Sequence, residues 1–122
     1  MLNVQNENSL VTVGNDEIFV CRYSDNIKLE PEDVEVVIKN YDDYAGDRDL
    51  KVLLVFPKNT TVSSAARSIA EKRERPALAE ALVIESTLQR ILFKFYKASR
   101  RVKYPIKEFS NTESAIRWLN NR

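Results

Sequence analysis

Basic side chains recur along one predicted helix, which begins near Ser86 and follows an apolar stretch of the chain. On a helical wheel, Phe93 points into the basic side, opposite an apolar stripe that begins at Leu88 and Ile91. A phenylalanine exposed among cations is typical of a contact surface. The candidate surface consists of Arg90, Phe93, Lys94, Lys97, Arg100 and Arg101.

Three interpretations of this basic helix compete. It contacts a protein partner or a second copy of the chain, it is a solvated face with Phe93 covered by a neighbouring element, or it binds nucleic acid or an anionic membrane. The net charge of +1 argues against nucleic acid, because that affinity depends on neutralised phosphates. Residues 1–56 carry a charge of −7 and residues 85–122 carry +6, and such asymmetry can steer a charged partner or pair two copies. We therefore expect a protein partner or a homodimer.

Residue types exclude most enzyme chemistry. The chain has no histidine, which removes the commonest general base and the commonest metal ligand, together with Ser-His-Asp and Cys-His catalysis. Two glycines are too few for a glycine-rich phosphate loop. Lys58 and Glu85 lie near the ends of predicted strands, where charged residues are ordinary. We predict no catalytic residue, no metal and no cofactor.

The length of 122 residues predicts one domain, with the polar residues 1–8 flexible. Cys21, the lone cysteine, cannot form an internal disulfide. It is expected to be a strand residue packed in the hydrophobic core. No apolar run approaches the ~20 residues of a membrane helix, and no hydrophobic signal segment follows Met1. These features predict a cytoplasmic protein.

The elements that position these residues centre on the apolar run Leu50–Phe56, which predicts a strand covered on both faces. The whole chain is predicted to have the element order β-β-α-β-α-β-α-β-α. This is an α/β fold in which four helices pack on a mixed, mainly parallel sheet of about five strands. The other strands are expected at Leu10–Val13, Glu17–Tyr23, Ala79–Ile84 and Ile106–Phe109, and the helices start near Pro31, Asn59, Ser86 and Ser110.

Helix ends also carry signals. Residues 59–61 supply an N-cap, and residues 86–89 and 110–113 read as capping boxes. Lys72, Arg73 and Arg75 suit the negative C-terminal end of the second helix, which Pro76 stops.

This order and the C-terminal third resemble the STAS domains, which have the SpoIIAA-like fold, and above all the small uncharacterised STAS-like proteins of bacteria. The resemblance rests on residues 89–96, on Lys103-Tyr104-Pro105, on Phe109 and on the helix residues 115–119. It implies a non-catalytic regulatory or interaction module that acts through protein–protein contacts.

The resemblance also implies a modification site. Antagonist STAS proteins bind a kinase and are switched by phosphorylation of a serine in an Asp-Ser-Ser-Gly motif after the central strand. Residues 63–66 occupy that place, with Ser64 matching the acceptor, Ser63 in place of the aspartate and Ala66 in place of the glycine. A phosphate at a helix N-terminus is electrostatically favourable. An ordinary helix start is the alternative.

A second function is small-ligand binding. STAS domains resemble the CRAL-TRIO lipid-binding fold, which implies an apolar pocket for a lipid or a nucleotide between the first helix and the sheet. Tyr41 and Tyr44 are the candidate lining residues, and core packing is the competing explanation for both.

Overall fold

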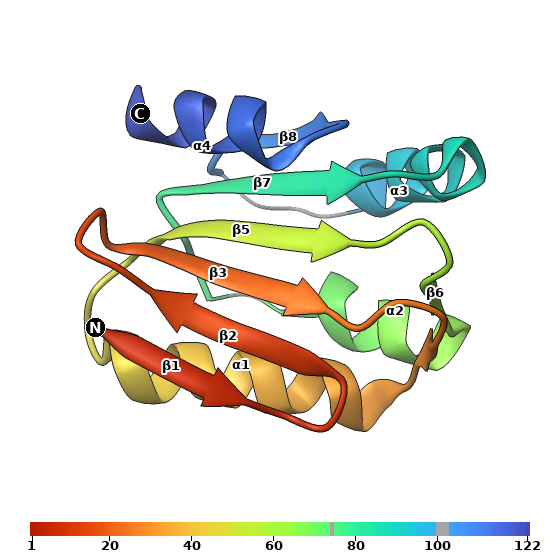
Figure 1. Ribbon diagram of the computed structural model, residues 1–122, viewed down its shortest axis with the longest axis horizontal. Helices are drawn as coiled ribbons and strands as arrows, with labels where there is room; N and C mark the ends of the chain where they lie inside the picture. Colours follow the sequence, from red (N-terminus) through yellow and green to blue (C-terminus); the bar gives the residue numbers. More distant parts are fainter. Residues whose placement is uncertain (74, 100–102) are drawn as a thin grey trace.

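A six-stranded sheet is the centre of the computed structural model, which describes residues 1–73, 75–99 and 103–122 (Figure 1). Its strands are β1 (Leu2–Gln5), β2 (Ser9–Val13), β3 (Ile18–Tyr23), β5 (Lys51–Phe56), β7 (Ala79–Ile84) and β8 (Ile106–Phe109). They lie in the order β1-β2-β3-β5-β7-β8. β2 pairs antiparallel with both β1 and β3, and β3, β5, β7 and β8 are parallel. The mixed, mainly parallel α/β sheet is confirmed, with six strands instead of about five.

Helices cover the two faces of the sheet unequally. One face packs against α1 (Pro31–Ala45), α2 (Ser64–Glu71) and α3 (Thr87–Ser99), and the other against α4 (Thr112–Asn120) (Figure 1). Val52 and Phe56 of β5 join the core beneath α1–α3, whereas Leu53 and Val55 join the core beneath α4. The central strand is therefore buried on both faces, as its apolar run predicts.

The N-terminal residues form a strand that the sequence does not predict. Leu2–Gln5 are the edge strand β1, antiparallel to β2. Leu2 and Val4 pack against the core, while Asn3 and Gln5 alternate with them. This alternation of period two buries one face of a segment whose overall composition is polar.

The predicted N-cap at residues 59–61 is wrong. Thr61 belongs to β6 (Thr61–Val62), which pairs in parallel with β4 (Lys28–Leu29) in a separate two-stranded sheet. The buried hydroxyl of Thr60 donates a hydrogen bond to the carbonyl of Ser24 at 2.6 Å, so this side chain bonds to the loop after β3 and does not cap α2. Ser63 caps α2 instead, accepting from the backbone N–H of Ala66 at 3.0 Å.

The two predicted capping boxes form only in part. Asn111 is the N-cap of α4, and it accepts from the backbone N–H of Ser114 at 2.8 Å. At α3, Ser86 Oγ accepts from the backbone N–H of Gln89 at 3.4 Å. The Gln89 amide does not return a bond: it is buried, and among the residues that the structure describes neither of its polar atoms has a hydrogen-bond partner. Such a group lowers stability, since its hydration is lost without replacement.

Candidate ligand-binding cavity

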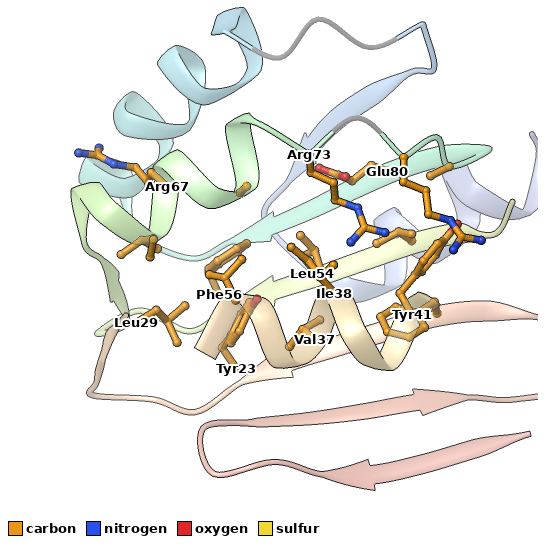
Figure 2. A pocket seen from close by; sticks show the side chains of 18 of the residues that line it. Tyr23, Leu29, Val37, Ile38, Tyr41, Leu54, Phe56, Arg67, Arg73 and Glu80 are labelled. Atoms are coloured by element: carbon orange, nitrogen blue, oxygen red, sulfur yellow. The ribbon is translucent and has the colours of Figure 1, made fainter. Parts of the chain in front are cut away.

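A cavity of about 100 Å³ lies between the sheet and the helices α1, α2 and α3 (Figure 2). Its apolar lining includes Phe19 of β3, Leu54 of β5, Val37 of α1, Ala70 of α2 and Phe93 of α3. Arg67 and Leu29 lie at one end, and Tyr41, Arg73 and Glu80 lie at the other (Figure 2). The cavity is therefore an apolar space with charged groups at its ends.

Tyr41 organises one end of the cavity. Its hydroxyl oxygen accepts a hydrogen bond from the backbone N–H of Leu50 at 2.9 Å and donates to the carbonyl of Pro76 at 3.4 Å. Burial raises the pKa of Tyr41 above its ordinary value, and the bond from Leu50 and the charge of Arg75 oppose this effect. The neutral phenol thus ties the end of α1 to the start of β5 and to the segment before β7.

Two guanidinium groups lie against the Tyr41 ring. Those of Arg73 and Arg75 are each 5.0 Å from its centroid. Asp42 Oδ1 accepts from Arg73 Nη2 at 3.3 Å and from Arg75 Nη1 at 3.0 Å. The side chains of Arg73 and Arg75 are only 18% and 26% exposed, so these cations are largely removed from water and share one carboxylate.

A buried carboxylate faces the same cavity. Glu80 is 5% exposed, lies between Val52 and Ile106 in the sheet register, and lines the cavity. The Tyr104 hydroxyl donates to Glu80 Oε1 at 3.4 Å. Acidic side chains are rarely this buried, so Glu80 marks the polar end of the site.

Of the two tyrosines expected in a pocket, only Tyr41 lines this one among the described residues. The Tyr44 ring lies beneath the guanidinium of Arg48, at 5.3 Å, and its hydroxyl donates to the exposed Glu17 carboxylate at 3.3 Å. Sequence reasoning missed Arg73, Arg75 and Glu80 as site residues. The available signal was Glu80, a single charge within the apolar run of β7.

The predicted orientation of α3 is wrong. Phe93, expected on an exposed basic side, is only 8% exposed, and its ring centroid lies 4.6 Å from that of Phe56. Leu88 and Ile91, expected to face the core, are 68% and 50% exposed. The helix has apolar residues on both sides, and the aromatic contact with Phe56 accompanies burial of the side that carries Phe93.

The other residues of the predicted contact surface are placed only in part. Lys94 is exposed, whereas Arg90 is half-buried and its Nε donates to the carbonyl of Ile84 at 3.4 Å. Arg100 and Arg101 lie outside the described residues, as does the side chain of Lys97.

Ser64 lies at the first residue of α2 and is exposed. Its Oγ accepts a hydrogen bond from Arg67 Nη2 at 3.3 Å. Arg67 also lines the cavity, so one side chain contacts both the serine and the cavity.

The remaining candidates lie apart from the cavity. Lys58 and Glu85 are exposed, and the backbone N–H of Lys58 donates to Glu85 Oε2 at 3.2 Å. Cys21 is buried in β3 as expected, and burial raises its pKa to about 12.

Across the described ranges, no group of three or more acidic or cysteine side chains can hold a metal ion. Nor does any helix there have the length and apolarity needed to cross a bilayer.

The arrangement of strands and helices defines a SpoIIAA-like fold. The chain is similar to the solved structure of an uncharacterized protein from the DUF3478 family with a SpoIIAA-like fold from Shewanella loihica PV-4. The TM-score is 0.65, with 17% identity over 95% of this chain and 98% of that chain. This likeness confirms the fold expected from the resemblance.

The chain belongs to the family described as Domain of unknown function (DUF7793), whose model matches residues 12–122. A protein with unknown function from Arthrobacter sp. FB24 matches with 22% identity over 98% of each chain and a TM-score of 0.37. No curated protein matches the chain.

Proposed function

We propose that this chain is a non-catalytic binding domain whose cavity holds a small, mostly apolar ligand. The observation that carries the proposal is the apolar cavity of about 100 Å³ beneath α1, α2 and α3. Protein interiors are normally packed with few voids larger than a water molecule. An apolar cavity with a few polar groups at its edge is typical of ligand sites.

The size of the cavity favours one of the two ligand classes expected from the sequence. Pockets for drug-sized molecules enclose roughly 300–1,000 Å³, and a nucleotide is of that size. This cavity is smaller, at about 100 Å³, and its lining includes aliphatic and aromatic side chains such as Val37, Leu54 and Phe19. The proposed ligand is therefore a short apolar molecule or the end of a longer lipid chain.

Filling the cavity tests the proposal. Ala70 lines the cavity, whereas Ala65 is exposed on the same helix and does not line it. The titration measures binding of 1-hexanol and hexanoate by calorimetry to the wild type, Ala70→Leu and Ala65→Leu. We expect Ala70→Leu to lose binding and Ala65→Leu to retain it. Equal binding to both variants, or no binding to the wild type, contradicts the proposal.

Protein contact through α3 is a second candidate function, supported by the exposure of Leu88 and Ile91. An apolar pair on a helix that also presents Lys94 suits a protein partner or a second copy of the chain. Sedimentation velocity and capture from lysate compare the wild type with Leu88→Asp. The matched control is Leu78→Asp, because Leu78 is 53% exposed and lies outside α3. Equal association of all three proteins contradicts this candidate.

Ser64 is a candidate site for regulation by phosphorylation. A phosphate on this exposed first residue of α2 meets the positive end of the helix and Arg67 three residues later. Pairing with phosphate draws Arg67 toward Ser64 and away from the end of the cavity that it lines. Hexanoate titration of the Ser64-phosphorylated chain tests this link, and an affinity equal to that of the unmodified chain contradicts it.

A further inference from the structure

We infer that the ligand of the cavity carries a carboxylate and that Arg73 binds it. This inference rests on the proposed function, and it adds the chemical class of the ligand's head group. Arg73 lines the cavity, and its side chain lies at the same end as Tyr41 and Glu80 (Figure 2).

Arg73 has hydrogen-bonding capacity to spare. A guanidinium has several N–H donors in a planar fork, yet within the described residues the Arg73 side chain makes one hydrogen bond, to Asp42 at 3.3 Å. Only 18% of this side chain is exposed, so water reaches little of it. A carboxylate that accepts two parallel N–H bonds is the natural partner for such a fork.

Arg75 differs from Arg73, although both lie against the Tyr41 ring. Arg75 donates to Asp42 at 3.0 Å, to the carbonyl of Arg48 at 3.0 Å and to the carbonyl of Gly46. These bonds fasten the segment before β7 to the C-terminal end of α1. Arg75 is therefore structural, and Arg73 is the cation available to a ligand.

The charges at this end favour a monoanion over a phosphate. Arg73 and Arg75 share the single carboxylate of Asp42. Asp42 Oδ1 accepts from both guanidinium groups, so this group of three side chains carries one net positive charge. One added negative charge gives Arg73 its own counterion, whereas a dianion exceeds that charge and meets stronger repulsion from Asp42.

The test compares two probes with the same apolar body, hexanoate and 1-hexanol, by calorimetric titration at low salt. The proteins are the wild type, Arg73→Gln and the control Arg48→Gln. Arg48 also lies over a tyrosine ring, but its side chain does not line the cavity. We expect the wild type to prefer hexanoate. Arg73→Gln should weaken hexanoate binding about tenfold to a hundredfold, because a charge-assisted hydrogen bond is lost, and leave 1-hexanol within about twofold. Arg48→Gln should change neither affinity.

Several results overturn the inference and leave the cavity proposal intact. These are equal affinity of the wild type for both probes, an equal loss of both in Arg73→Gln, or tighter binding of hexyl phosphate than of hexanoate. Absence of binding by either probe contradicts both proposals. If Arg73→Gln does not fold, Arg73→Lys keeps the charge and loses the fork. We then expect a smaller but selective loss of hexanoate affinity, and an unchanged preference for hexanoate overturns the inference.

Discussion

The guanidinium of Arg73 lies 5.0 Å from the centroid of the Tyr41 ring. This contact joins the segment that follows α2 to the C-terminal part of α1, and both residues line the cavity. The Tyr41 ring also meets the edge of Phe19, with centroids 5.2 Å apart. One tyrosine therefore links the apolar wall of the cavity to its charged end.

Asp42→Asn should raise the affinity for hexanoate. The substitution removes the carboxylate that Arg73 and Arg75 share, so the charged end of the cavity becomes more positive. The side chain of Asp42 is 44% exposed, so loss of the pairs should lower the free energy of unfolding by only about 1 kcal/mol or less. Calorimetric titration measures the affinity, and urea unfolding measures the stability. Weaker binding of hexanoate contradicts the role given to Arg73.

Stability should fall at alkaline pH because of Cys21. Burial raises the pKa of the folded thiol from 9.0 to about 12, so above pH 9 the unfolded chain releases a proton that the folded chain retains. Deprotonation then favours the unfolded state, and the free energy of unfolding should fall by about 1.4 kcal/mol per pH unit in this window. The raised pKa of Tyr41 acts in the same direction at higher pH.

Urea unfolding at a series of pH values compares the wild type with Cys21→Ala. The variant should be less stable at neutral pH, because a buried side chain is shortened, and it should lose the decline that begins near pH 9. Parallel curves for the two proteins show that the thiol does not cause the decline.

Phe93→Ala should destabilise the chain strongly. Phe93 is 8% exposed and packs on Phe56, and loss of a buried phenylalanine typically costs about 3–5 kcal/mol. The control Leu88→Ala, on the same helix but 68% exposed, should change stability by about 0.5 kcal/mol or less. Chemical unfolding distinguishes them. A larger loss in Leu88→Ala restores the orientation of α3 predicted from the sequence.

Gln89→Met should stabilise the chain. The Gln89 amide is buried, and neither of its polar atoms has a hydrogen-bond partner within the described part of the chain. A thioether of similar length removes the cost of burying these unpaired atoms. We expect a gain of about 1–2 kcal/mol in the free energy of unfolding. Gln89→Glu is the opposing variant, because it places a charge at the same buried position, and it should destabilise. A loss of stability in Gln89→Met indicates that the amide is hydrogen-bonded in solution.

Much of the fold is predictable from the pattern of apolar residues. The unbroken run at Leu50–Phe56 predicts a strand covered on both faces. The other predicted strands alternate along the chain with segments of helical periodicity, and this gives the order of the main elements. The edge strand β1 is missed because composition hides the alternation of Leu2 and Val4. The orientation of α3 is missed because Leu88, Ile91 and Phe93 place apolar groups on both sides of the helix.

The site is less predictable, because its residues come together only through tertiary contacts. Arg73 and Arg75 are interpreted from sequence as cations at a helix end, whereas in the structure they meet Tyr41 and Asp42 from α1. Arg73 and Asp42 are 31 positions apart in the sequence, so no local pattern brings them together. A cavity depends on the mismatch of packed side chains, which no periodic pattern reports.

The most direct test of the central claim is a filtered nuclear Overhauser experiment on the chain with bound hexanoate. Val37 and Leu54 line the cavity from opposite walls, α1 and β5, whereas Leu88 and Ile91 are exposed on α3. The cavity proposal predicts contacts from the hexanoate methylenes to the methyl groups of Val37 and Leu54. Contacts confined to Leu88 and Ile91, or absent from every residue that lines the cavity, contradict it.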